Sequence, residues 1–270
     1  MSGGGEIKER LEARLDDYLT RAERGEVAVS RFLTPGERRL AERYLASKGA
    51  SRRALFFGGY GEAERVCLFL LPEYFVDIPE LMPAADADPS EVLEVGENGV
   101  GAVEIRGSGF RQLTHRDYLG SLLGLGLERD SLGDIALQDE HRAVVFCTRG
   151  MASFLCSNVE KIASDTVKCL PYTVDDTFTD GRKYRPISDT VASPRLDCVV
   201  AALTNLSREA AQTAVRSGLV EVEYETEERT DRMLTPPVTL SVRGHGKFIL
   251  RSFDGETKKG RLRLRADQYV

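Results

Sequence analysis

The stretch "SPRLDCVVAALTNLSREAAQTAVRSGLVEV", from Ser193 to Val222, predicts two short helices joined by a tight connection. Ser193 and Pro194 have the residue types of a helix cap and a first helical position. Ser207 predicts the cap of a second helix, and Gly218 is the residue type that ends a helix in a left-handed conformation. The stretch therefore indicates a two-helix unit at the start of the last domain.

The second of these helices has a cationic face. Arg208, Gln212 and Arg216 are spaced at i, i+4 and i+8, so they share one face, with small apolar residues on the others. A guanidinium in the first helical turn, beside free backbone N–H groups, suits a phosphate. With Arg195 on the preceding helix, the pattern favours RNA contact. The structural alternative for any single arginine is a solvated charge.

Two predicted strand regions, "VTLSVRGHGKFILRSF" and "TKKGRLRLRA", follow the helix pair. Alternation along a strand sends Arg261, Arg263 and Arg265 to one face. Glycines flank His245 between Arg243 and Lys247, so the backbone there could approach a ligand closely. We expect these side chains to join the helix pair in one cationic surface. The candidate RNA contacts in this region are Arg243, His245, Lys247, Lys258, Lys259, Arg261 and Arg263.

The charge distribution agrees with an anionic partner for the C-terminal end. The chain has 37 Lys and Arg against 43 Asp and Glu, a net charge of −6. From Arg243 onward, however, positive charges exceed negative ones by five, so the preceding 242 residues carry an excess of 11 negative charges. Five scattered cysteines without a CxxC pair suggest reduced thiols in a cytosolic protein. We predict no cofactor, no metal site and no membrane span.

The segment "HRDYLGSLLGLG", from His115 to Gly126, contains the His-Arg-Asp of kinase catalytic loops. The metal-binding Asn expected five residues after the Asp is Leu122, and the Asp-Phe-Gly string is absent, so a kinase is excluded. The surrounding pattern predicts the order β-α-β-β-α-β of a ferredoxin-like or RRM-like domain. His115 and Arg116 then begin a helix and are candidate RNA contacts in this middle domain.

The predicted fold class is α+β with three domains. Residues 1–90 are expected to form an N-terminal α/β domain, with a helix over about residues 6–24 and a second helix beginning at "FLTPGERR". A Pro- and Asp-rich stretch near residues 77–91 predicts its boundary. Residues 91–175 form the RRM-like domain, 176–191 a polar linker, and 192–270 the RNA-binding domain with its basic C-terminal strand. The glycine-rich "GGYGEAER" is expected to be a tight turn.

The last segment resembles an S4 domain, a small RNA-binding module. "FLTPGE", "FFGGYGEAER", "HRDYLGSLLGLGLERDSLGDI" and "TKKGR" resemble, in the same order, the YlmH family of bacterial S4-domain proteins. This resemblance covers nearly the whole chain. It implies that Arg195, Ser207, Arg208, Gln212 and Arg216 face RNA and that Asp197 orders the first helix.

The resemblance implies a cytoplasmic, non-enzymatic protein, expected to be a monomer. It would bind rRNA and peptidyl-tRNA on the large ribosomal subunit in quality control or rescue of stalled ribosomes, alongside other quality-control factors. One alternative is an S4-containing RNA-modifying enzyme of the pseudouridine synthase type, which needs a catalytic Asp. Another is an interaction protein linked to cell division, for which the acidic N-terminal half could serve.

Overall fold

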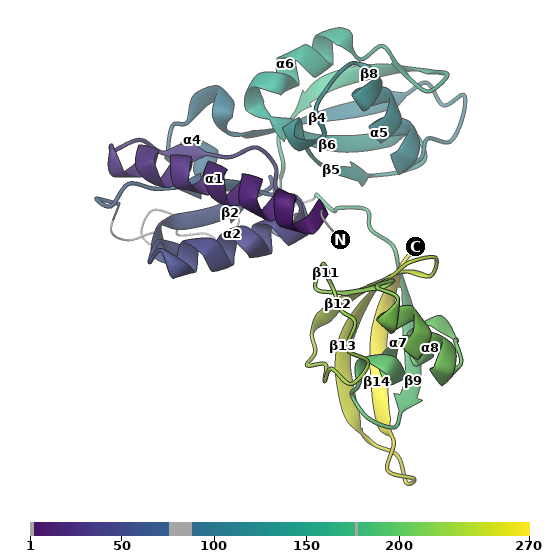
Figure 1. Cartoon of the computed structure of the whole chain (residues 1–270). Coiled ribbons are helices and arrows are strands. Elements are labelled where there is room, and N and C mark those ends of the chain that lie inside the picture. Colours follow the sequence, from purple (N-terminus) through teal and green to yellow (C-terminus); the bar gives the residue numbers. More distant parts are fainter. Residues whose placement is uncertain (1–2, 76–87, 176–177) are drawn as a thin grey trace. The chain divides into compact units, whose positions relative to one another are not determined.

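The chain forms two compact units of mixed α/β structure, Met1–Gly181 and Arg182–Val270. The computed structural model describes residues 3–75, 88–175 and 178–270 (Figure 1). All of its strand pairs are antiparallel. Most of the boundary expected at residues 77–91 lies outside the described residues. None of the described helices has the length and apolar character needed to cross a membrane.

The N-terminal part of the first unit pairs two helices with a small sheet. Its elements are α1 (Gly3–Glu23), β1 (Ala28–Val29), α2 (Pro35–Ser47), β2 (Ala54–Phe57) and β3 (Cys67–Leu70), with strand order β1-β3-β2. Thr34 caps α2, because its hydroxyl accepts from the Glu37 N–H and the Glu37 carboxylate accepts from the Thr34 N–H. The helix begins where the capping-box pattern predicts.

The middle of the first unit has the β-α-β-β-α-β order that the sequence predicts, with one additional two-residue strand before the last strand. A short helix, α4 (Pro89–Val92), precedes β4 (Val100–Gly107), α5 (His115–Gly124), β5 (Leu132–Leu137), β6 (Arg142–Thr148), α6 (Arg149–Asn158), β7 (Lys161–Ile162) and β8 (Asp165–Tyr172). The strand order is β5-β6-β4-β8-β7. Helices α5 and α6 cover one face of this sheet, where Tyr118 and Leu155 pack against Val103 and Val145 (Figure 1).

The other face of this sheet is partly covered by the N-terminal part. Phe32 and Phe69 share a buried cluster with Phe146 of β6. The glycine-rich loop closes over the same ring: a side chain at Gly59 would lie 2.2 Å from the Phe146 ring, and Gly59 has φ +104°. The loop is therefore a packing element, and Asp134 stabilises it by accepting from the Glu64 N–H at 2.7 Å.

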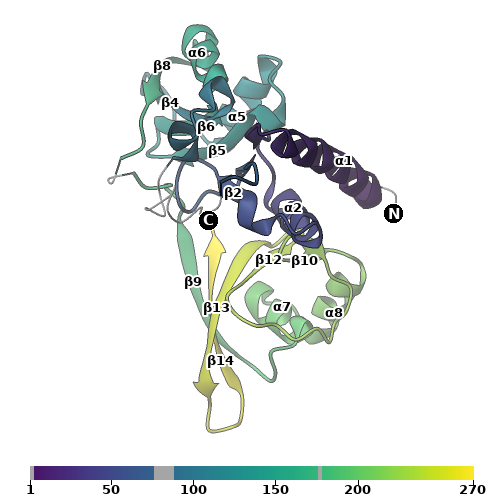
Figure 2. The same ribbon diagram turned by 90° about the vertical axis from the view of Figure 1, so that its left-hand side faces the viewer.

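The second unit is a six-stranded sheet with two helices on one face. Its elements are β9 (Tyr184–Val191), α7 (Leu196–Thr204), α8 (Arg208–Arg216), β10 (Val220–Val222), β11 (Glu225–Thr226), β12 (Val238–Val242), β13 (Gly246–Glu256) and β14 (Leu262–Tyr269), in the order β11-β10-β12-β13-β14-β9. Val199 and Val215 of the helices pack against Leu240, Phe248 and Leu264 of the sheet. Figures 1 and 2 show α7 and α8 side by side against this face.

Two details of the second unit differ from the sequence expectation. Residues 184–191, expected to belong to a linker, form the edge strand β9, which pairs along β14 from Tyr184 with Tyr269 to Val191 with Leu262. Helix α7 begins at Leu196 rather than at Pro194. The reason is that the Pro194 carbonyl accepts a hydrogen bond from the Leu234 N–H and that Arg195, which is extended, bridges to Met233.

Candidate nucleic-acid interface

A buried carboxylate, Asp197, links the two helices of the second unit. It is 0% exposed in the first turn of α7. Its Oδ1 accepts from the Arg195 Nε at 3.0 Å and from the Cys198 N–H at 3.0 Å. Its Oδ2 accepts from the Gln212 Nε2 on α8 at 2.7 Å. Asp197 thus does more than order its own helix: it also holds the side chains of Arg195, before α7, and Gln212, on α8.

Two guanidinium groups converge on this carboxylate and remain open to solvent. Nε and Nη2 of Arg208 each lie 3.4 Å from the Asp197 Oδ2, and Nη2 of Arg195 lies 3.2 Å from it. The Arg195 side chain is 34% exposed and that of Arg208 is 57% exposed. One negative charge cannot neutralise two positive ones. The cluster therefore presents oriented donors and an excess positive charge, as a phosphate site requires.

The pKa of Asp197 reflects this competition. Burial acts to raise it, because the charged form is desolvated. The hydrogen bonds from Arg195 and Gln212, with the charges of Arg195 and Arg208, outweigh burial and hold the pKa of Asp197 well below its ordinary value. The carboxylate is thus ionised at neutral pH and engaged by its donors. A pseudouridine synthase would need an aspartate available to its substrate, and Asp197 does not meet that requirement.

The remaining helix residues of the predicted set are placed as the sequence pattern requires. Ser207 is the N-cap of α8, where its hydroxyl accepts from the Ala210 N–H at 3.1 Å. Arg216 is exposed in the last turn of α8. The structure brings three predicted residues, Arg195, Arg208 and Gln212, to Asp197, and Arg216 lies one turn beyond Gln212 on the same helical face. Ser207 acts there as a cap.

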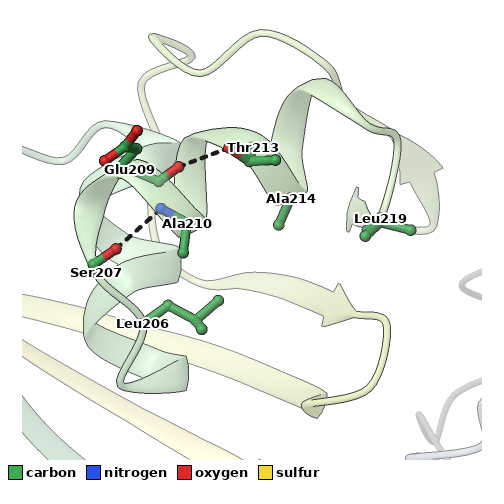
Figure 3. Close-up of a pocket in the computed structure, with 7 residues that line it drawn as sticks. All are labelled: Leu206, Ser207, Glu209, Ala210, Thr213, Ala214 and Leu219. Carbon is green, nitrogen blue, oxygen red and sulfur yellow. Dashed lines mark hydrogen bonds between the residues drawn. The ribbon is translucent and has the colours of Figure 1, made fainter.

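Another face of α8 has a different character. Figure 3 shows a shallow hollow beside the helix that is lined by Leu206, Ser207, Glu209, Ala210, Thr213, Ala214 and Leu219. Its single charged residue is acidic, and the Ser207 hydroxyl and the Glu209 backbone carbonyl are occupied by helix bonds. This hollow does not suit an anion. The cationic face of α8 is thus the one that meets Asp197.

The predicted strand residues are distributed over two hairpins. Arg243 and His245 are exposed at the β12–β13 hairpin, where Gly244 and Gly246 have positive φ values of 83° and 105°. Lys247 is half-buried, with its ammonium group 4.9 Å from the ring centre of Tyr224 and 4.5 Å from that of Tyr269. Lys258 and Lys259 are exposed in the turn between β13 and β14.

The β14 arginines do not join the surface of the helix pair, which corrects the expectation of one cationic surface. Leu264 and Ala266 are buried against the helices, so Arg263 and Arg265, which alternate with them, point to the opposite face. Arg261 precedes the strand and donates from Nε to the Thr190 hydroxyl at 3.0 Å. The candidate residues of the second unit therefore lie in three places: on the helix pair and at the two hairpins, which stand at opposite ends of β13.

In the first unit, His115 and Arg116 are exposed at the start of α5. Asp117 completes a capping box with Thr114, whose hydroxyl and N–H lower the pKa of Asp117. The aspartate of the His-Arg-Asp string is thus the third helical residue, whose carboxylate completes the capping box. Desolvation and the charge of Arg129 lower the pKa of His115. Its imidazole is neutral at pH 7, which leaves Arg116 as the charged member of the pair.

A second buried carboxylate with two arginines was missed from the sequence. Glu104 of β4 is 4% exposed and accepts from the Arg106 Nε at 2.6 Å and from the Arg142 Nη1 at 3.3 Å. Arg106 pairs across strands with Arg142 on one side and Lys168 on the other, so three cations form one row on the sheet. The signal was an acidic and a basic residue at alternate positions of an otherwise apolar strand.

Two sequence comparisons indicate the family of the chain. Residues 99–176 match the family model described as "Putative RNA-binding domain in YlmH". The chain is 30% identical over 210 residues to the Bacillus subtilis (strain 168) protein named "Ribosome-associated protein quality control protein P2", covering 77% of this chain and 75% of that protein. A solved structure named "Cell division protein ylmH from Streptococcus pneumoniae" aligns with a TM-score of 0.48 at 19% identity, over 64% of this chain and 95% of that one.

Proposed function

The chain belongs to the YlmH family, and from that premise we propose that it is a non-enzymatic RNA-binding protein that acts on ribosomes. The main contact in this proposal is the face of α7 and α8 around Asp197. The observation that carries it is the pair of exposed guanidinium groups, Arg195 and Arg208, that one buried carboxylate holds in a fixed orientation. Preorganised arginines bind phosphate oxygens with less loss of side-chain entropy than freely moving ones.

We assign the domains on the same basis. The strand order β5-β6-β4-β8 with two helices on one face supports an RRM-like domain for residues 91–175. The α7–α8 pair with its sheet supports an S4 domain for residues 192–270. Phe146, the aromatic residue of β6, is fully buried under the glycine-rich loop. Base stacking on that residue, as in conventional RNA-recognition sheets, therefore has no place in the proposal.

The relative from Bacillus subtilis is named for ribosome-associated protein quality control. We propose that this chain has the same kind of partner: the large ribosomal subunit, with contacts to rRNA and to peptidyl-tRNA. Its role would be to hold a stalled, tRNA-bearing subunit in one state while other quality-control factors act. In this proposal the protein works in the cytoplasm as a monomer and needs no cofactor.

Co-sedimentation with purified large subunits tests the proposal. The double variant Arg195→Ala and Arg208→Ala removes both guanidinium groups from the helix face. We expect it to lose most of its binding at physiological salt, because phosphate contacts dominate RNA affinity. The matched control is Arg24→Ala with Arg52→Ala, which removes the same charge from two exposed positions of the first unit.

Equal sedimentation of the helix-face variant and the unchanged protein would rule out this assignment. Equal losses in both double variants would instead mean that net charge alone governs binding. Thermal unfolding of each variant identifies a loss that is due to misfolding. Mass mapping of the bases in rRNA incubated with the protein checks the absence of a modification activity, which the non-enzymatic assignment requires.

A further inference from the structure

The second unit has a cationic face that the helix pair does not use. We call the side of strands β13, β14 and β9 that points away from α7 and α8 the outer face. It carries four cations: Lys247, Arg251, Arg263 and Arg265. Their strand neighbours Phe248, Leu250, Leu264 and Ala266 are buried on the helix side, so alternation fixes the orientation of the cations.

The carboxylates of the outer face do not balance these cations. Arg251 donates from Nε to Asp267 at 2.8 Å, and Arg265 forms an ion pair with Asp254. Within the described part of the chain, no carboxylate pairs with Arg263, which is exposed. The acidic β10–β11 turn, where Glu223 and Glu225 flank Tyr224, reaches Lys247, whose ammonium lies 4.9 Å from the Tyr224 ring centre. Strands β12 and β13 separate this turn from the β14 arginines. Positive charge therefore accumulates at the β9 edge.

Aromatic rings are arranged among these cations. Tyr184 of β9 and Tyr269 of β14 are cross-strand partners, with ring centres 5.1 Å apart in an edge-to-face contact. The Arg251 guanidinium lies 5.8 Å from the Tyr184 ring centre, and Lys247 lies against Tyr269. These contacts fix the rings in position. Tyr184 remains 37% exposed, so part of its surface is available to a ligand.

We propose that the outer face binds a single-stranded RNA segment, as a second RNA contact separate from the helix pair. A base stacks on Tyr184, and phosphates contact Arg263 and Arg265. Such sites in proteins combine a basic track for the backbone with aromatic rings on which bases stack. Arg263 and Arg265 lie about 6.6 Å apart along the strand, so they can engage successive phosphates. The inference rests on the proposed function for the nature of the partner but not for the site.

A single strand fits this face better than a duplex does. In a duplex the bases are paired and stacked on one another, so Tyr184 would have no base face to meet. Every base has an aromatic face that can stack on a tyrosine ring, so the contact is expected to be sequence-tolerant. With RNA contacts on two opposite sides of one sheet, the second unit could hold two RNA segments at once.

The test uses the full chain and two fluorescein-labelled probes: a ten-nucleotide oligouridylate and an RNA hairpin without overhangs. Fluorescence anisotropy measures both affinities over a range of salt concentrations. We expect the double variant Tyr184→Ala and Arg263→Gln to bind the oligouridylate about ten-fold more weakly, through lost stacking and one lost phosphate contact. The slope of log affinity against log salt should fall by about 0.7. Hairpin affinity should not respond to Tyr184→Ala.

Two controls keep the result interpretable. Tyr184→Phe retains the ring and should retain oligouridylate binding, so a loss in Tyr184→Ala alone identifies stacking. Arg24→Gln removes an exposed charge elsewhere and should leave binding unchanged. Unchanged oligouridylate affinity in the Tyr184 and Arg263 double variant, with unchanged thermal unfolding, would overturn the proposal.

The two proposals fail in different ways. If Arg195→Ala with Arg208→Ala abolishes oligouridylate binding and the outer-face variant does not, the single strand binds at the helix pair and the outer-face proposal is wrong. If the helix-face variant sediments normally with large subunits while the outer-face variant loses oligouridylate, the helix-face assignment is wrong and the outer face remains.

Discussion

Asp197 in the second unit and Glu104 in the first are both buried carboxylates that hold two arginines, each at least partly exposed. They differ in what they connect. Asp197 joins residues from the segment before α7, from α7 itself and from α8. Glu104 joins Arg106 on its own strand to Arg142 on the adjacent strand, and the β4–β6 ladder already aligns these residues from Val100 with Thr148 to Arg106 with Arg142.

The difference shows which guanidinium groups depend on their carboxylate for position. Arg106 and Arg142 stay neighbours on the sheet whatever stands at Glu104, because backbone pairing fixes them. Arg195 and Arg208 lie on separate elements, and both contact the Asp197 carboxylate. Asp197 therefore determines the geometry of its cationic site, whereas Glu104 mainly reduces repulsion within a row of cations.

The largest expected difference is in stability. Asp197→Ala should lower the free energy of unfolding of the second unit by about 3 kcal/mol, because it removes the partner of a buried charge cluster. Glu104→Ala should cost the first unit about 1–2 kcal/mol, since its arginines can turn to solvent. Native-state hydrogen exchange of the α7 and β4 amides measures the two units separately. Equal losses in both would contradict the comparison.

Acid should weaken the Asp197 cluster. Its pKa in the folded state lies below the value of about 3.9 for an unfolded aspartate. The stabilisation is therefore fully present above about pH 5 and is lost as the pH falls through 4 toward the folded pKa. Thermal unfolding between pH 6 and pH 2.5 should show a steeper loss in the unchanged protein than in Asp197→Asn. Parallel curves would show that Asp197 does not carry this dependence.

The smallest expected effect, on RNA affinity, distinguishes a positioning role of Asp197 from simple electrostatics. Asp197→Asn removes a negative charge, so simple electrostatics predicts tighter RNA binding. We expect binding to large subunits to weaken about five-fold, because ordering each released arginine costs about 0.5–1.5 kcal/mol. Glu104→Gln, the matched change, should leave affinity unchanged or raise it slightly. Co-sedimentation of both variants at one salt concentration measures the pair, and tighter binding by Asp197→Asn would refute the positioning role.

Local patterns predicted much of the fold. The capping box at Thr34, the β-α-β-β-α-β order and the end of α8 at Gly218 all follow from residues close together in sequence. Two aspartates in first helical turns show that a local pattern does not predict the role of a residue in the folded protein. Asp117 completes a capping box, whereas Asp197 binds two arginines and a glutamine, although each aspartate closely follows an arginine. The difference depends on Arg208 and Gln212, which approach Asp197 only after α8 folds against α7.

The edge strand β9 also could not be predicted from the local sequence pattern. "YRPISDTV" lacks a continuous apolar alternation and contains Pro186, which argues against a central strand. An edge strand tolerates proline because one side of it needs no hydrogen-bond donor. Its partner β14 is more than 70 residues away in sequence, so the pairing becomes visible only in the fold. The β14 arginines lie on the face away from the helices because Leu264 and Ala266, which alternate with them, pack against α7 and α8 in the folded unit.

The packing of the Phe146 ring beneath Gly59 determines which fragments of this protein can be expressed as folded units. A fragment beginning at residue 91 would keep every strand of the middle sheet but lose Phe32 and Phe69, which share the Phe146 cluster. The uncovered aromatic patch would be exposed to solvent, so such a fragment should aggregate or bind detergent. Shortening the protein from its N-terminus is thus a poor way to isolate the middle sheet, whereas cutting near Gly181 follows the division between its two units.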